Sequence, residues 1–159
     1  MSLSSLRSDL SYYNRQVAYW QNSANIYSSQ IAGYDADLGD RNDQIQRART
    51  AKGKCEEMRP ANTEVKDGLR AMGQEAATAI EVGDCTSAAE KIADPIQGHI
   101  DAAVSAAQAL IDKLQGEIND LNAKRGAAIE GRDYSNGRAD MYRASAARTR
   151  TAIANYSED

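Results

Sequence analysis

The sequence predicts an all-α protein, an elongated antiparallel helical hairpin of two long, coiled-coil-like helices with a short helical tip region. Three observations lead to this expectation. Apolar residues recur at alternating three- and four-residue spacings in two long stretches, only two prolines occur in 159 residues, and the 42% apolar content includes no Phe and one Trp. A chain with so few large apolar side chains can bury a long, narrow seam but not a thick core. We therefore expect one domain over residues 1–159.

The first long helix is expected to run from about residue 3 to residue 58. The alternating spacing starts at Leu3 and holds for nearly seven heptads, with Arg41 as its one exception. Arg59 and Pro60 are expected to end this helix, because the residue before a proline avoids the α conformation. The seam residues predicted here are Leu6, Leu10, Tyr13, Val17, Trp20, Tyr27, Ile31, Leu38 and Ile45.

The second long helix is expected from about residue 95 to residue 156. Asp94 is suited to cap its start, and Pro95 to occupy the first helical position. The apolar stripe weakens between Arg125 and Ser135, in a zone rich in glycine, and then returns. The seam residues predicted on this helix are Ile111, Leu114, Ile118, Leu121, Tyr142 and Ile153.

The tip region between the long helices is expected to hold two short ones, at about residues 63–82 and 87–93. Val65 and Met72 lie on one face of the first, and Gly83 is suited to end it. Ser87 and Glu90 have the spacing of a capping box for the second.

The two stripes also predict a register, in which residues that face each other sum to 159. Trp20 then faces Ala139 and Tyr13 faces Ala146, so that large side chains meet small ones. The glycine-rich zone of the second helix lies opposite Tyr27 and Tyr34. Side-chain volume missing from one helix thus admits rings from the other.

No catalytic residue, metal ligand or cofactor is expected. His99 is the only histidine, and no set of ligands or catalytic partners in a recognisable spacing accompanies it. The acidic run that starts at Asp35 has Asp40 and Gln46 where an EF-hand needs Gly and Glu. Both features are typical of solvated helix faces, and the sequence predicts that the protein is not an enzyme.

Cys55 and Cys85 are the only cysteines, and neither belongs to a CxxC motif. They are expected either as two ordinary buried thiols or as one disulfide that ties the first helix to the tip. The disulfide would matter only outside a reducing compartment.

Tyr12, Tyr19 and Ile26 form a second apolar stripe, about 100° around the helix from the seam. A two-helix hairpin cannot cover both lines. The second stripe is either covered by a third helix of this chain or left open for a partner, and we expect the partner-binding role for these three residues.

Charge and hydropathy argue against several classes of partner and location. A net charge of -4 argues against nucleic acid as the main partner. No run approaches the ~20 apolar residues of a transmembrane helix, and the N-terminus lacks the pattern of a secretory signal peptide. We expect a cytoplasmic protein, or one exported with its partner by a route that needs no signal peptide.

The chain resembles the small helical accessory proteins encoded beside LXG toxins of bacterial type VII secretion systems, and more distantly the WXG-type hairpins. The resemblance rests on the length, the scarcity of proline and two long helices around a shorter helical middle. The defining motifs are absent: Trp20 is followed by Gln21 and Asn22 instead of x-Gly, and Tyr156 stands one residue too close to the terminal acids. The resemblance implies a subunit that binds the helical N-terminal domain of a toxin and helps to deliver it to the secretion machine.

The sequence therefore predicts a non-catalytic subunit that pairs through long helices with a partner helical protein, either a toxin domain or a sibling accessory subunit. The alternative is a self-assembling coiled-coil scaffold, in which the second stripe packs against its own copy.

Overall fold

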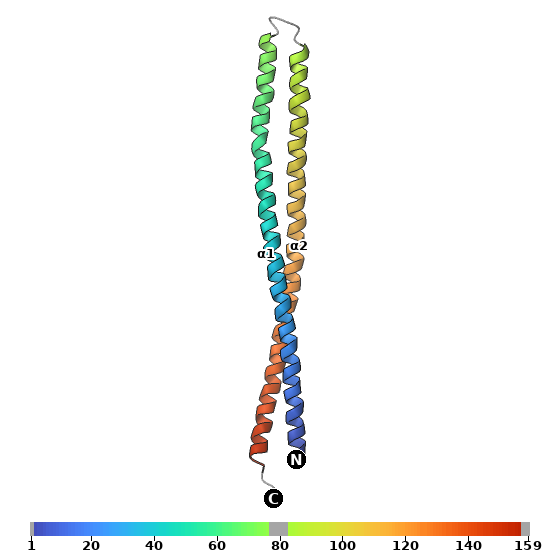
Figure 1. Ribbon diagram of the computed structural model, residues 1–159, viewed down its shortest axis with the longest axis vertical. Helices are drawn as coiled ribbons and strands as arrows, with labels where there is room; N and C mark the ends of the chain where they lie inside the picture. Colours follow the sequence, from blue (N-terminus) through green and yellow to red (C-terminus); the bar gives the residue numbers. More distant parts are fainter. Residues whose placement is uncertain (1, 77–82, 157–159) are drawn as a thin grey trace. The chain divides into compact units, whose positions relative to one another are not determined.

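Two helices make up the part of the chain that the structure describes. The computed structural model covers residues 2–76 and 83–156, with side chains for 2–72 and 91–156. Helix α1 runs from Leu3 to Ala76 and helix α2 from Gly83 to Ala154, and they pack against each other as a hairpin (Figure 1). No strand occurs within these ranges. The predicted all-α helical hairpin is confirmed.

The hairpin divides into two compact units. Unit 1 consists of Met1–Gly39 and Asn119–Asp159, and unit 2 of Asp40–Ile118. Each unit takes one segment of α1 and one of α2, so each has its own interhelical seam.

Both expected proline boundaries are wrong. Helix α1 continues through Pro60 and helix α2 through Pro95. A proline inside a helix removes one hydrogen bond, at a cost of ~3 kcal/mol. Both prolines are exposed, so the carbonyl groups that lose their partner can be hydrated. Contacts between the helices then outweigh the local preference, and the predicted ends at residues 58 and 95 do not exist.

The prediction of two separate tip helices is also wrong. Residues 63–76 belong to α1, residues 87–93 belong to α2, and Gly83 begins a helix instead of ending one. The remainder of the predicted helix 63–82, residues 77–82, lies outside the described residues. Asp94 does not cap a helix, because it lies in the interior of the continuous α2. Its carboxylate pairs instead with the ammonium group of Lys66 on α1.

The seam of unit 1 alternates large and small side chains. Ala139 is fully buried and Ala146 almost so, at 0% and 1% exposure, as expected for small residues that face rings. A Cβ atom built on Gly131 would lie 2.6 Å from Cζ of Tyr27, so that ring occupies the space a side chain would take. Among the predicted seam residues Leu6 and Ile31 are buried, and the rest are half-buried: Leu10, Tyr13, Val17, Trp20, Tyr27, Leu38, Leu121, Tyr142 and Ile153.

The seam of unit 2 is more completely buried. Its predicted members Ile45, Ile111, Leu114 and Ile118 are all buried. A polar residue is buried in this seam: Asn62 is 9% exposed, and its Nδ2 donates to the Ala93 carbonyl oxygen at 3.0 Å and to Gln97 Oε1 at 3.3 Å. The numbers of Asn62 and Gln97 sum to 159, which agrees with the predicted register.

One side of each unit is polar. Polar side chains at seam positions, and at the positions directly after them, reach across to the other helix on this side. In unit 1, Arg125 Nε donates to Asp35 Oδ1 at 2.5 Å, and Arg143 donates to Gln21. In unit 2, Arg59 pairs with Asp101 at 2.8 Å. These pairs leave the opposite side of each unit for residues that immediately precede a seam residue.

Candidate functional site

The predicted partner-binding residues are exposed on unit 1. Tyr12 is 43% exposed, Tyr19 62% and Ile26 53%. Each immediately precedes a seam residue, and this position rotates its side chain out of the contact between α1 and α2. Neither described helix covers the three side chains.

Helix α2 adds two residues to the same side. Tyr134 is 62% exposed and Met141 43%, and each immediately precedes a seam residue. The ring of Tyr134 meets the ring of Trp20 edge to face, with centroids 5.7 Å apart, and Trp20 meets Tyr19 in the same way at 5.1 Å. We call Tyr12, Tyr19, Ile26, Tyr134 and Met141 the aromatic face.

Arg138 joins the two halves of this face. Its Cζ atom lies 5.5 Å from the ring centroid of Trp20 and 5.3 Å from that of Tyr142. Its Nη2 donates to the Tyr142 hydroxyl at 3.1 Å. A guanidinium group held over two rings is attracted by both π-systems. The aromatic face thus lies beside a cluster of Trp20, Arg138 and Tyr142 whose contacts are made within the chain itself.

Two tyrosines interact directly across the hairpin. The rings of Tyr12 and Tyr142 meet edge to face, with centroids 6.2 Å apart. A side-chain hydrogen bond with Tyr142 raises the pKa of Tyr12, and the nearby Arg138 charge opposes part of that shift. Tyr12 is therefore a neutral hydroxyl at physiological pH and not a phenolate.

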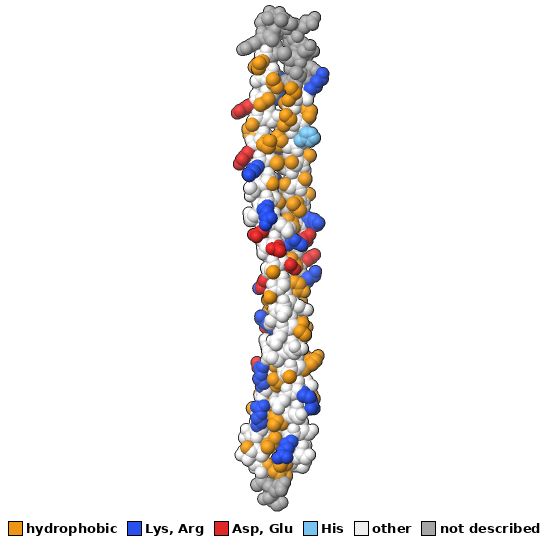
Figure 2. Space-filling model, viewed as in Figure 1, with side chains coloured by type: hydrophobic (Ala, Val, Ile, Leu, Met, Phe, Trp, Pro, Cys, Tyr) orange, Lys and Arg blue, Asp and Glu red, His pale blue; other side chains and the backbone are white. Residues whose placement is uncertain are grey.

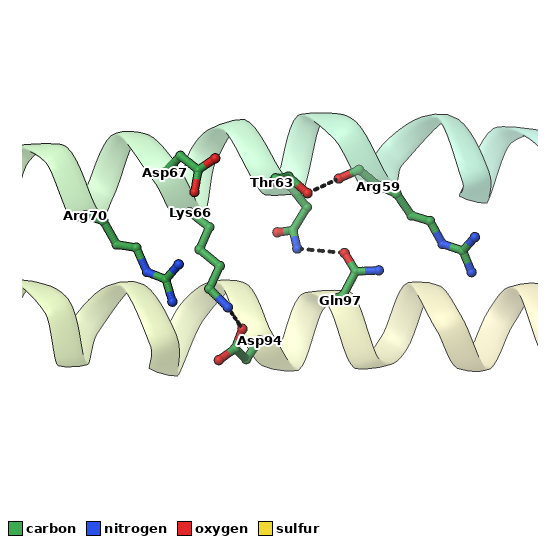
Figure 3. Close-up of a pocket in the computed structure, with 8 residues that line it drawn as sticks. Arg59, Thr63, Lys66, Asp67, Arg70, Asp94 and Gln97 are labelled. Atoms are coloured by element: carbon green, nitrogen blue, oxygen red, sulfur yellow. Dashed lines mark hydrogen bonds and ion pairs between the residues drawn. The ribbon is translucent and has the colours of Figure 1, made fainter.

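A polar groove of ~420 Å³ opens in unit 2 (Figure 3). Arg59, Lys66 and Arg70 line it from α1, and Asp94 and Gln97 from α2. Lys66 pairs with Asp94, and Arg59 with Asp101 just beyond the groove. These ion pairs and the Asn62 amide hold the helices together around the two prolines. The charged side chains that line the groove thus serve contacts between the helices. Its described lining presents no nucleophile aligned with a base.

The other residues that the sequence singled out do not converge. His99 is exposed, and Cys55 is a half-buried free thiol. The side chain of Cys85 lies outside those that the structure describes. Within the described residues no group of three His, Cys, Asp or Glu side chains could hold a metal ion.

Neither helix contains, in its described part, a segment long and apolar enough to cross a bilayer.

Sequence reasoning missed Tyr134, Met141 and Arg138. For Tyr134 and Met141 the signal was available, because each, like Tyr12, Tyr19 and Ile26, is an apolar residue immediately before a seam position. Arg138 is charged, and this rule does not find it. The same rule finds six exposed apolar residues in unit 2, namely Met58, Val65, Met72, Ile92, Ile96 and Leu110. These residues form a second, separate surface.

Comparison with protein-family models, with curated proteins and with solved structures finds no match to this chain.

Proposed function

We propose that this chain is a non-catalytic protein-binding subunit, and that a helix of a partner protein docks on the aromatic face of unit 1. The observation that carries the proposal is the exposure of Tyr12, Tyr19 and Ile26 beside Tyr134 and Met141. Tyrosine and arginine are enriched among the residues that dominate binding energy. The seven-residue spacing on both helices suits the apolar stripe of a third helix.

The most specific form of the proposal is an accessory or targeting factor for a toxin of a type VII secretion system. It is supported by the resemblance described above and by the need of such a factor for a long helical surface. The partner would then be the helical N-terminal domain of an LXG toxin or a sibling accessory subunit.

The test uses Trp20, the single tryptophan of the chain, as a probe inside the binding site. The chain is mixed with the helical N-terminal domain of an LXG toxin encoded beside it, and binding is followed by Trp20 fluorescence and by co-elution. We expect a saturable change that the double variant Tyr12→Ser/Tyr19→Ser weakens by about 30-fold or more, as for interface hot spots.

The matched control is Tyr156→Ser, which removes an exposed tyrosine that lies outside the aromatic face. It is expected to leave binding unchanged. Circular dichroism separates two ways in which the proposal can fail. Loss of helicity in Tyr12→Ser/Tyr19→Ser would assign the stripe to the protein's own core, whereas unchanged binding in a helical variant would remove the aromatic face from the interface.

A further inference from the structure

Unit 2 has an exposed apolar surface that the proposed function does not use. Its six exposed residues belong to both helices and immediately precede a seam position: Met58, Val65, Met72, Ile92, Ile96 and Leu110. In Figure 2 hydrophobic side chains gather over the part of the hairpin that Figure 1 colours green to yellow. We call these six residues the aliphatic face.

The aliphatic face is almost free of charge. The other residues on this side between Met58 and Met72 are Ala61 and Gly68, and those between Ile92 and Leu110 are His99, Ala103 and Ala106. Among the positions that immediately precede a seam position, the nearest charged residues are Lys54 on α1 and Lys113 on α2. A charged partner finds nothing here to pair with, whereas two copies of the face can meet without placing like charges opposite each other.

Gly68 gives a second observation. A Cβ atom built on it meets nothing within 4 Å, so the packing of this chain does not require a glycine there. Glycine nevertheless costs ~1 kcal/mol relative to alanine inside a helix. On an exposed apolar face, a glycine lets another helix approach closely.

We propose that the aliphatic face is the dimer interface between two copies of this chain. Six half-exposed aliphatic side chains present on the order of 500 Å² per copy, so two copies bury on the order of 1,000 Å², the size at which specific interfaces begin. Two paired helices that meet two others also give the layered packing of a four-helix bundle. The proposal does not depend on the aromatic face, which belongs to unit 1.

The experiment is sedimentation equilibrium of the full chain over a range of concentrations up to about 1 mM. We expect the wild-type mass to rise from 17.2 kDa to twice that value. Val65→Glu/Ile96→Glu is expected to weaken the dimer by about 30-fold or more, because it would bury charges without partners. Both positions are exposed in the single chain, at 53% and 42%, so helicity is expected to be kept. Met58→Lys/Leu110→Lys repeats the test with the opposite charge.

Two further variants make the result specific. Tyr19→Glu, on the aromatic face, is expected to leave the dimer intact. Gly68→Leu is expected to weaken it while adding helix propensity to the monomer. A wild-type chain that stays monomeric up to about 1 mM overturns the proposal, as does a dimer that survives both charged double variants. A wild-type chain that forms the dimer but does not bind the helical partner would refute only the proposed function.

Discussion

The contact between Gly131 and Tyr27 gives the sharpest test of the packing in unit 1. An alanine Cβ at position 131 would lie 2.6, 2.7 and 2.9 Å from Cζ, Cε1 and Cε2 of the Tyr27 ring. Carbon atoms in contact are normally ~3.5–4.0 Å apart, so the ring edge must move by about 1 Å. Ser135 Oγ donates to the Gly131 carbonyl oxygen at 2.8 Å and lies 3.1 Å from Ser23 Oγ on α1, so this part of α2 is also linked to α1 by polar contacts.

Two opposing free energies set the effect of Gly131→Ala. Alanine stabilises a helix interior by about 1 kcal/mol relative to glycine. Overpacking a filled site costs about 1–3 kcal/mol. We therefore expect a net change in the free energy of unfolding between about zero and a loss of 2 kcal/mol. Gly137 is the matched control, since a Cβ there meets nothing within 4 Å. Gly137→Ala should show the full gain of about 1 kcal/mol.

Urea unfolding followed by circular dichroism measures both variants. The difference between them isolates the overpacking cost. In a Tyr27→Ala background the ring is gone, and Gly131→Ala should then stabilise as Gly137→Ala does, which makes a double-mutant cycle. Equal stabilisation by Gly131→Ala and Gly137→Ala in the wild-type background would refute the proposed packing of the Tyr27 ring against the backbone of α2.

Two other substitutions test local features. Pro60→Ala restores a helical N–H donor within the continuous α1 and should raise the free energy of unfolding by up to about 3 kcal/mol; a loss of stability in the same urea titration would show that the chain turns at this proline. Tyr142→Phe removes the hydrogen bond that raises the pKa of Tyr12. Absorbance would report all the tyrosines of the chain together, so the ring signals of Tyr12 are followed by nuclear magnetic resonance; its pKa should shift toward the ordinary value, whereas an unchanged titration would rule that bond out. Because the folded-state pKa is raised, the stability it contributes is complete below the unfolded pKa near 10 and is lost as pH rises through the folded pKa. The wild type should therefore lose stability above about pH 10 more steeply than Tyr142→Phe.

The seam could be predicted from the sequence because it depends on spacing alone. Apolar residues at alternating three- and four-residue spacings lie on one face of a helix. The sizes of these side chains then restrict which residues of the two helices can face each other. The predicted pairing agrees with the hydrogen bond between Asn62 and Gln97. The ring of Tyr27 lies over Gly131, one residue from the predicted partner but within the glycine-rich zone expected opposite it. Both are consequences of which residues lie level with each other on the two helices.

The helix ends could not be predicted because they depend on contacts between residues far apart in the sequence. Pro60 and Pro95 are local signals for a boundary. The pairs Arg59–Asp101 and Lys66–Asp94 join the two helices across those signals, and no local rule contains them.

Three of the five residues of the aromatic face were accessible to sequence reasoning. Tyr12, Tyr19 and Ile26 were found from their seven-residue period. Tyr134 and Met141 share that period on α2 but follow a weakened part of the seam, where the stripe was harder to trace. Their place beside the first three depends on the antiparallel arrangement, which brings the positions before each seam residue to one side.

The two prolines of unit 2 have a consequence for hydrogen exchange. Asn62, two residues after Pro60, bonds to the carbonyl of Ala93, two residues before Pro95, so both helices lack an amide donor near the same level. Each backbone ladder is interrupted there, and local opening needs to break fewer bonds than elsewhere in unit 2. Within unit 2, protection of the backbone amides from exchange should therefore be lowest beside the prolines. The Asn62 hydrogen bond keeps the two helices aligned when the helical turns around it open.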